Sequence, residues 1–383
     1  MAEAIRSLTH LLEVASSKRF LAVVEPGDRG LAESLPFPFI AMVGEWEMKL
    51  SLLLAIINPA IGGVLLLGPR GTGKTTAVRS LSPLLPDVER SLCAYGCTTE
   101  DFESGGVDSI CPDCAKKLGL GEPLTFTDRA RLIELPLHSE LPDVIGGIDE
   151  RAAAHQRMLV KPGILSHADR NLLYVDEVNL LVRDVADAIL DAAAQGVYTV
   201  RRGPISATYR SRFILVGSMN PEEGMLRPQI ADRFGLRALV RGLNNSSERW
   251  EAYQRSHAFE LNPRGFIEYY RETTESIREQ ILVARKRLPG VQLAPETTRL
   301  GLEAIQKLGV TSLRGTSVLF ESARAYAAAD GRDQADPSDL DAIAVPALRM
   351  RRSVFMDRYA SDQDQEDKAI LETFMQAGEK PAE

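Results

Sequence analysis

The chain has 383 residues, 44% of them hydrophobic and 26% charged, and its formal net charge at pH 7 is −8. This composition is typical of a globular protein of about two domains, and the acidic balance disfavours a nucleic-acid-binding function. No uninterrupted run of about 18 apolar residues predicts a membrane span, and the N-terminus lacks the pattern of a secretory signal. We therefore expect a cytoplasmic protein with no membrane span, in which cysteines are normally reduced.

A glycine-rich loop follows the first apolar strand that the sequence predicts, Val64–Leu67. The loop has the pattern G-x-x-x-x-G-K-T and consists of Gly68, Pro69, Arg70, Gly71, Thr72, Gly73, Lys74 and Thr75. Its glycines allow backbone N–H groups to surround phosphate oxygens, while Lys74 can reach the β- and γ-phosphates and Thr75 can bind Mg²⁺. A glycine-rich turn with a chance lysine is the alternative. Because the motif is complete and lies between a predicted strand and a predicted helix, we expect it to bind a nucleoside triphosphate.

All four cysteines lie in an expected insertion, residues 91–119, outside the nucleotide-binding motifs: Cys93, Cys97, Cys111 and Cys114. Their spacing, C-x3-C followed by C-x2-C, allows four thiolates to surround one Zn²⁺. A thiol redox switch and chemically inert cysteines are the alternatives. The sequence leaves all three interpretations open and places the segment outside the catalytic machinery.

Two further apolar strands end in polar side chains suited to ATP hydrolysis. The run N-L-L-Y-V is followed by Asp176 and Glu177, and the run R-F-I-L-V-G-S-M is followed by Asn220. Asp176 can hold Mg²⁺ through its water shell, Glu177 can polarise the attacking water, and Asn220 can orient that water. An exposed acidic strand end is the alternative interpretation of the two carboxylates. Parallel sheets bind ligands at the carboxyl ends of their strands, so we expect these residues to lie beside the phosphate loop.

The segment just before the strand that ends at Asn220 predicts a β-hairpin, because it alternates around Gly203-Pro204. A plain connecting hairpin is the alternative.

Together these motifs resemble those of the AAA+ ATPases, with Walker A at Gly68–Thr75, Walker B at Asp176-Glu177 and sensor 1 at Asn220. Longer segments, above all N-P-E-E-G-x-L-R-P-Q-x-x-D-R-F-G-L, are similar to the I subunit of magnesium chelatase, over about residues 36–352. The resemblance implies an ATPase motor that helps to insert Mg²⁺ into protoporphyrin IX for chlorophyll or bacteriochlorophyll synthesis. It also implies ATP and Mg²⁺ as cofactors, a homo-oligomer in the form of a hexameric ring, and D-type and H-type chelatase subunits as partners.

The resemblance also assigns roles to residues outside the two Walker motifs. Arg233 resembles the arginine finger, which reaches the γ-phosphate of a neighbouring subunit, and Arg227 is a second candidate for such a contact. Arg314 resembles sensor 2, which ties the nucleotide to the lid. Val43 and Gly44 would lie near the adenine. Residues 141–166 would form an insertion with a short hairpin, a candidate contact surface for partners; a plain connecting hairpin is the alternative. For any single arginine the alternative is a solvated surface charge.

The resemblance and the helical pattern of the last third predict an α/β fold: an AAA+ P-loop NTPase core with a parallel sheet, followed by a smaller α-helical lid domain. The expected parts are an N-terminal extension (1–35), the ATPase core (36–245), the helical lid (246–360) and a polar C-terminal tail (361–383). Ser246 or Ser247 is expected to cap the first lid helix. Two rival functions stay open: a MoxR-type AAA+ chaperone that remodels a partner protein, and a DNA-acting AAA+ protein, which the acidic charge disfavours.

Overall fold

The computed structural model describes residues 35–93, 95–148, 160–202 and 205–352, together with a few residues near the C-terminus. Nearly all of the predicted extension (1–35) and of the predicted tail (361–383) lies outside the described residues, as do the tips of the two predicted hairpins. Among the residues that are described, no helix is both long and apolar enough to cross a membrane.

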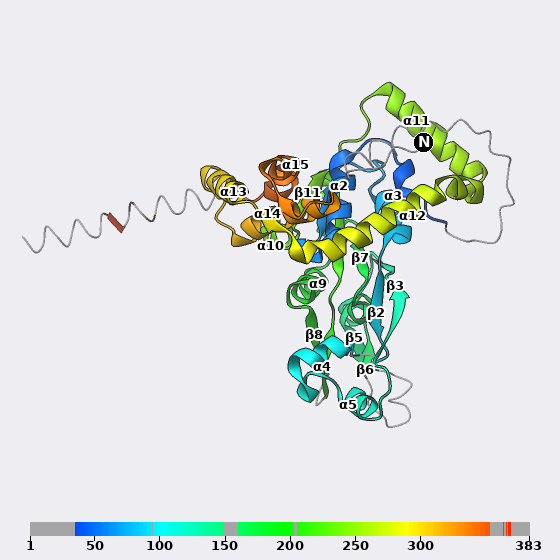
Figure 1. The fold of residues 1–383 in the computed structure, drawn as a ribbon, viewed down its shortest axis with the longest axis vertical. Coiled ribbons are helices and arrows are strands. Elements are labelled where there is room, and N and C mark those ends of the chain that lie inside the picture. Colours follow the sequence, from blue (N-terminus) through cyan, green and yellow to red (C-terminus); the bar gives the residue numbers. More distant parts are fainter. Residues whose placement is uncertain are drawn as a thin grey trace, which may run out of the picture.

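A five-stranded parallel sheet forms the centre of the core (Figure 1). Its strands, in spatial order, are β11 (Leu236–Leu239), β1 (Val64–Leu67), β10 (Ile214–Met219), β7 (Leu172–Val175) and β4 (Leu132–Leu135). Every neighbouring pair is parallel. The three strands that the sequence predicts are β1, β10 and β7, and they lie next to one another in the middle of the sheet. Their carboxyl ends therefore meet at one edge, where parallel sheets bind ligands.

Both faces of this sheet are covered, which explains why β1 and β7 are continuous runs of buried hydrophobic residues. Along β1, Val64 and Leu66 belong to one hydrophobic cluster and Leu65 and Leu67 to another, so the two clusters lie on opposite faces. The helices of the core are α2 (Trp46–Ile57), α3 (Lys74–Arg79), α6 (Leu141–Ile145), α8 (Ile164–His167), α9 (Arg183–Gln195) and α10 (Pro228–Arg233). Buried residues of α2 belong to the first cluster and those of α9 to the second.

Within residues 246–352, five helices follow the sheet and form the predicted helical part. They are α11 (Ser246–Leu261), α12 (Pro263–Arg287), α13 (Pro295–Lys307), α14 (Leu313–Ala329) and α15 (Pro337–Leu348), with a short parallel pair, β12 (Gln292–Leu293) and β13 (Gln334–Ala335). The predicted cap of α11 is wrong: Asn245 is its N-cap, because the Asn245 side-chain oxygen accepts a hydrogen bond from the Ser247 N–H at 3.0 Å. In Figure 1 α12 runs across the molecule, and its buried residues share one hydrophobic cluster with those of α2. The helical part is therefore packed directly on the core.

Two arginines that follow α15 attach this helical part to the core. Arg349 forms an ion pair with Glu47 of α2 and donates to the Arg237 carbonyl oxygen at 2.6 Å. The buried Arg351 pairs with Asp232 of α10 at 3.1 Å and also donates to two backbone carbonyls that precede β11. A buried guanidinium is tolerated when its donors are satisfied in this way. These contacts fix α10 relative to the helical part.

Among the described residues, three antiparallel two-stranded units lie in the lower half of Figure 1. They are β2 (Asp87–Ser91) with β3 (Thr125–Arg129), β5 (Gly146–Ile148) with β6 (Val160–Pro162), and β8 (Val197–Arg202) with β9 (Ile205–Arg210). Both predicted hairpins are confirmed, as β5–β6 and β8–β9. Between β2 and β3 lie the four cysteines and two helices, α4 (Thr99–Gly105) and α5 (Pro112–Gly119).

Candidate functional site

The predicted phosphate loop connects β1 to α3 and requires glycine at two positions for clear physical reasons. Gly73, the N-cap of α3, has φ 82°, in the left-handed region that L side chains rarely adopt. Gly68 is packed so closely that a Cβ there would lie 2.1 Å from the Val240 carbonyl oxygen. The loop and the neighbouring strand ends enclose a pocket of about 410 Å³. This phosphate pocket is lined by residues 70–76, Asp176, Glu177 and residues 218–220.

Lys74 places a positive charge in the phosphate pocket. Its ammonium group donates to the carbonyl oxygens of Gly68 and Pro69, both at 2.7 Å, and the residue is 9% exposed. Burial lowers the pKa of Lys74, and the nearby carboxylate of Asp176 does most to oppose this effect. A buried ammonium group whose direct partners are neutral carbonyls strongly attracts an anion, so the pocket fits a phosphate group.

Oxygen atoms of Thr75 and Asp176 form one edge of this pocket, and two neighbouring hydroxyl groups organise them. The Thr75 hydroxyl donates to Asp176 Oδ2 at 3.3 Å. The other carboxylate oxygen, Oδ1, accepts hydrogen bonds from the Tyr174 hydroxyl at 2.9 Å and from the Ser218 hydroxyl. Hydroxyl and carboxylate oxygens are the ligands that Mg²⁺ prefers, so this group of residues fits the ion that accompanies a nucleoside triphosphate.

The sequence analysis missed Tyr174 and Ser218, although the alternation of side chains along a strand points to both. Tyr174 lies two residues before Asp176, and Ser218 lies two residues before Asn220. Residues two apart on a strand share a face of the sheet, so each accompanies a predicted site residue. Burial raises the pKa of Tyr174, and its hydroxyl therefore stays a proton donor to Asp176 at neutral pH.

Replacing Tyr174 by phenylalanine is expected to weaken Mg²⁺ binding and to leave nucleotide binding intact. The change removes one hydrogen bond to Asp176 and keeps the buried ring. Loss of a group that orients a metal ligand lowers metal affinity by roughly tenfold. Titrating Mg²⁺ in the presence of a fluorescent ATP analogue should show that loss, while binding of the Mg²⁺-free analogue is unchanged. Tyr269→Phe, at an exposed position of α12, is the matched control; equal loss of both kinds of binding would indicate a displaced loop instead.

Glu177 follows β7 with a left-handed backbone, φ 47°, which is uncommon for glutamate. Its N–H donates to the Ser218 hydroxyl at 3.3 Å and so supports this conformation. Its carboxylate forms an ion pair with Arg70 at 3.2 Å, and Arg70 pairs with Glu223 as well. Arg70 therefore holds the Glu177 carboxylate at the wall of the phosphate pocket, where it can accept a proton from a water molecule.

Asn220 borders the same pocket and is 5% exposed. Its amide oxygen accepts a hydrogen bond from the Glu222 N–H at 3.2 Å, and its amide nitrogen donates to the Glu223 carboxylate at 3.0 Å. The residue thereby caps the short 3₁₀ helix η6 (Pro221–Glu223). An amide group has further donor and acceptor capacity, so orientation of a water molecule by Asn220 stays a prediction.

A second pocket, of about 620 Å³, adjoins the phosphate loop and has room for a nucleoside. Val43 lines it, in keeping with its predicted place near the adenine. Gly44 is not among the residues that line this pocket; it has φ 64°, and a Cβ there would lie 2.6 Å from Leu243, so its backbone packs closely against that residue. The sequence analysis missed Glu45, whose carboxylate accepts a hydrogen bond from the Gly242 N–H at 2.6 Å and whose pKa is raised by burial.

Three predicted arginines line neither pocket of their own chain: Arg227, Arg233 and Arg314. Arg227 precedes α10 and Arg233 ends it, where Arg233 forms a long ion pair with Asp191 at 3.5 Å. Arg314, near the start of α14, donates to the Asp232 carbonyl oxygen at 3.2 Å. The structure therefore gathers these arginines at α10 and does not bring them to the phosphate loop of the same chain.

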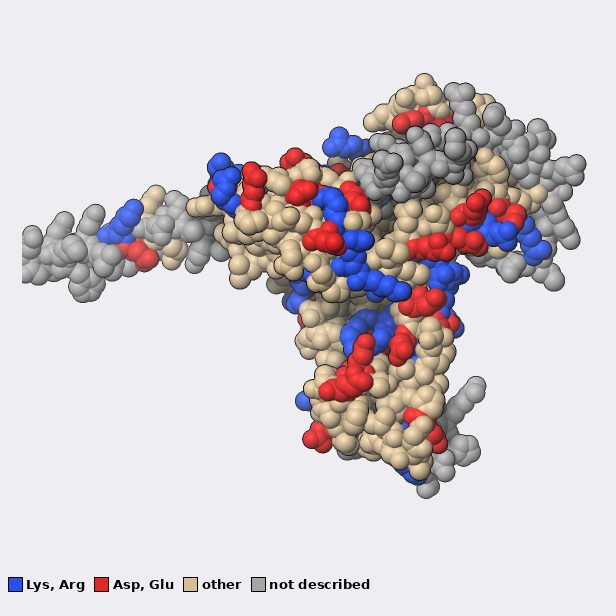
Figure 2. All heavy atoms as spheres, viewed as in Figure 1, with Lys and Arg blue, Asp and Glu red and all other residues tan. Residues whose placement is uncertain are grey.

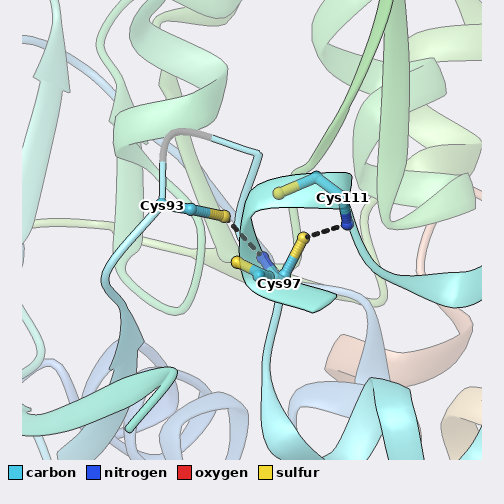
Figure 3. A group of neighbouring side chains, drawn as sticks. Cys93, Cys97 and Cys111 are labelled. Carbon is cyan, nitrogen blue, oxygen red and sulfur yellow. Dashed lines mark hydrogen bonds between the residues drawn. The ribbon is translucent and has the colours of Figure 1, made fainter. Parts of the chain in front are cut away.

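The four cysteines meet in one cluster, part of which Figure 3 shows. All four Sγ atoms lie within 4.8 Å of one another, and all four residues are free of disulfide bonds. The N–H of Cys97 donates to the sulfur of Cys93 at 3.4 Å, and the N–H of Cys111 donates to the sulfur of Cys97 at 3.3 Å. The hydrogen bond between the side chains of Cys93 and Cys97 lowers the pKa of Cys93 and raises that of Cys97. Burial raises the pKa of Cys114.

Comparison with known proteins gives consistent matches along the chain. The family described as "Magnesium chelatase, subunit ChlI" matches residues 148–229, and the family described as "AAA lid domain" matches residues 302–373. The magnesium-chelatase subunit ChlI homolog of Methanocaldococcus jannaschii is 40% identical over 83% of this chain and 87% of that protein. The magnesium-chelatase 38 kDa subunit of Rhodobacter capsulatus is 41% identical over 87% of this chain and 93% of that protein. The solved structure of a putative ATPase from Cytophaga hutchinsonii has the same fold, with a TM-score of 0.53 and 19% identity over 87% of this chain and 90% of that one.

Proposed function

Because the chain belongs to the magnesium-chelatase ChlI family of AAA+ ATPases, we propose that it is the motor subunit that couples ATP hydrolysis to insertion of Mg²⁺ into protoporphyrin IX. As a member of this family it is an ATP-dependent enzyme that uses ATP and Mg²⁺. In this proposal the product enters chlorophyll or bacteriochlorophyll synthesis. The observation that carries the proposal is the pocket in which Lys74, Thr75, Asp176 and Glu177 meet.

The side chains around the phosphate pocket account for ATP hydrolysis in this proposal. Lys74 neutralises charge on the β- and γ-phosphates, and Thr75 and Asp176 hold Mg²⁺, the latter through the water shell of the ion. Bound MgATP supplies the phosphoryl group that reacts. Glu177 accepts a proton from the attacking water, which Asn220 orients.

We propose a hexameric ring in which a neighbouring subunit completes each site. The position of Arg233 at the end of α10, outside both pockets of its own chain, supports a role for it across a subunit interface. Arg314, which donates to the Asp232 carbonyl oxygen of α10, is proposed as sensor 2, the residue that ties the nucleotide to the lid. A guanidinium group from the neighbour would neutralise the charge that develops on the γ-phosphate. Arg227 is the second candidate for such a contact. D-type and H-type chelatase subunits are the proposed partners, with the porphyrin on the H-type subunit.

The domain boundaries expected from the sequence are part of the proposal: an extension (1–35), a core (36–245) with a cysteine insertion (91–119), a lid (246–360) and a tail (361–383). The start of α11 at Ser246 supports the boundary between core and lid. A cytoplasmic location is proposed as well, because four closely spaced free cysteines are typical of a reducing compartment.

We also propose Zn²⁺ as a structural cofactor of this chain, held by Cys93, Cys97, Cys111 and Cys114. With Zn–S bonds of about 2.3 Å, tetrahedral geometry places the sulfur atoms about 3.8 Å apart. Because the four Sγ atoms already lie within 4.8 Å of one another, small inward movements would close the site. The redox alternative requires disulfide bonds in place of the metal.

A protein partner fits the surface better than DNA does. On the face shown in Figure 2, acidic and basic side chains of the described residues are interspersed and do not form one continuous basic area. The formal net charge of −8 points the same way. Proteins that bind DNA through its phosphates usually concentrate lysine and arginine on one face.

Reconstitution tests the proposed function. Purified protein mixed with D-type and H-type chelatase subunits, protoporphyrin IX, Mg²⁺ and ATP should form Mg-protoporphyrin, detected by its fluorescence. Omission of ATP, or use of Lys74→Ala protein, should prevent the reaction, because Lys74 is the ammonium group of the phosphate pocket. ATP hydrolysis without porphyrin metalation, in the presence of partners that work with an established I subunit, would support the MoxR-type chaperone alternative.

A further inference from the structure

The segment between β2 and β3, residues 92–124, is here called the cysteine module, and its own hydrophobic core is small. That core consists of the buried residues Cys97, Ile110, Cys114 and Leu124, and it is separate from the two large clusters on the faces of the sheet. So small an apolar core gives little stabilisation on its own, and small units of this kind are commonly held by a metal. The module therefore depends on what joins its cysteines.

A hollow borders the cysteine cluster and contains charged side chains of both signs. It is lined by Cys93, Cys111 and Cys114, together with Lys116 and Lys117 of the last turn of α5 and the acidic residues Asp113 and Glu122. Four thiolates around one Zn²⁺ carry a net double negative charge, and the two lysines are the nearby groups that can offset it.

Asp101 joins the cysteine module to β9. Its Oδ2 atom accepts hydrogen bonds from the N–H and the hydroxyl of Thr98, at 2.8 and 2.7 Å, and so caps α4 directly after Cys97. The same oxygen lies 2.7 Å from Arg210 Nε, at the end of β9. Asp101 and Arg210 are both largely shielded from water, with side-chain exposures of 11% and 21%, so the ion pair is stronger than one at the surface.

Further contacts attach the module to β9, which in turn packs on β8. Arg210 donates from its guanidinium to the Ser109 carbonyl at 2.7 Å and from its backbone N–H to the Tyr95 carbonyl at 3.0 Å. The Tyr95 ring stacks on Tyr209 of β9, with ring centres 5.2 Å apart, and Tyr209 stacks on Tyr198 of β8 at 5.4 Å. The module thus holds the hairpin through charge, backbone and aromatic contacts.

The attachment at Arg210 lies close in sequence to a strand of the nucleotide site. Only residues 211–213 separate Arg210 from β10, the strand that carries Ser218 and ends before Asn220. We propose that the Zn²⁺-bound cysteine module is a clamp that fixes the β8–β9 hairpin to the core, with Asp101 as the residue that joins metal site and hairpin. This proposal rests on the proposed Zn²⁺ site, and it is independent of the proposed chelatase activity.

The test uses full-length protein and two substitutions with matched controls. Cys114→Ser removes a buried metal ligand, and its control, Ala115→Ser, introduces a hydroxyl one residue further along. Asp101→Asn keeps an oxygen that can cap α4 and removes the charge that binds Arg210; its control is Asp108→Asn, at an exposed position of the same module. Zinc content is measured by elemental analysis, hairpin opening by hydrogen exchange of β8 and β9, and the nucleotide pocket by binding of a fluorescent ATP analogue.

We expect one zinc per chain in the wild-type protein, in both controls and in Asp101→Asn, and its loss in Cys114→Ser. The hydrogen-exchange rate of the β9 backbone amides should rise roughly tenfold or more in both test variants. Asp101→Asn loses the charged contact with Arg210, and Cys114→Ser loses the metal that holds the module. Binding of the ATP analogue should not change. Treatment of wild-type protein with a zinc chelator should give the same increase, which covers the case in which Cys114→Ser does not fold.

Two results would overturn the proposal. The first is that the purified protein contains zinc, yet the hydrogen-exchange rate of β9 stays unchanged both when the zinc is removed and in Asp101→Asn. This result would show that the module does not clamp the hairpin. Purified protein without zinc, whose four thiols are free or paired in disulfides, would show that no metal holds the module. Because ATP-analogue binding is measured in parallel, either result is distinguishable from failure of the proposed ATPase function.

Discussion

Glutamine at position 177 is expected to lower the rate of ATP hydrolysis by about 10²–10⁴, the usual contribution of a general base, with ATP binding unchanged. Glutamine has the shape of glutamate and can still accept a hydrogen bond from Arg70, so the wall of the phosphate pocket is preserved. It cannot accept the proton of the attacking water. Phosphate release measures the rate, and a fluorescent ATP analogue measures binding.

Glu222→Gln is the matched control for this prediction. Glu222 lies on η6 next to Asn220, but its side chain is exposed and is absent from the lining of the phosphate pocket. The control should hydrolyse ATP at the wild-type rate. Normal hydrolysis by Glu177→Gln would instead mean that Glu177 is not the base, whereas loss of both binding and hydrolysis would mean that its pairing with Arg70 shapes the pocket.

Arg233→Ala subunits are expected to bind ATP almost normally and to hydrolyse it some 10³–10⁵ times more slowly, the range found for arginine fingers. Binding should survive because Arg233 lines neither pocket of its own chain. Its side chain is 35% exposed and its pairing with Asp191 is long, at 3.5 Å, so the guanidinium is available to a neighbouring subunit. Arg299→Ala, an exposed position on α13 with a local ion pair, is the control and should be nearly as active as wild type.

Mixing two inactive variants tests whether Arg233 acts between subunits. Lys74→Ala protein lacks the ammonium group of the phosphate pocket, while Arg233→Ala protein lacks the finger. In a mixed ring some interfaces combine an intact pocket from the second variant with an intact finger from the first, so activity should partly return and should rise with protein concentration. Mixed rings that are verified by mass analysis and remain inactive would show that Arg233 acts within its own subunit or only supports the structure.

Local patterns in the sequence predict much of the fold. The strands β1 and β7 are predicted because each is a continuous apolar run, as burial on both faces requires, and β10 because it begins with an apolar run. The β8–β9 hairpin is predicted from the alternation around Gly203-Pro204. The phosphate loop is predicted from its glycine pattern, because positive φ at Gly73 and the close approach of Gly68 to Val240 are conditions that few other residues satisfy.

Other features depend on contacts between distant parts of the chain, which local patterns do not reveal. The Tyr174 and Ser218 hydroxyls matter because β7 and β10 lie side by side and bring both to one carboxylate oxygen. Asn245 caps α11 in preference to Ser246 and Ser247, a choice between three adjacent residues that all favour this position. The contact of Asp101 with Arg210 joins residues far apart in sequence, and neither residue belongs to a recognisable motif.

The helical part contacts both the nucleoside pocket and α10, and these two contacts matter for the proposed ring. At one end, Arg249 and Ala252 of α11 line the nucleoside pocket. At the other end, Arg314 of α14 and Arg351 contact Asp232, the residue next to Arg233. Because α11 packs on α12, and α12 packs on α14, one continuous set of packed helices connects the nucleoside pocket to Asp232. In the proposed ring, a shift of α11 caused by the bound nucleotide would reach Arg233 along this path, so the finger would respond to the nucleotide of its own subunit.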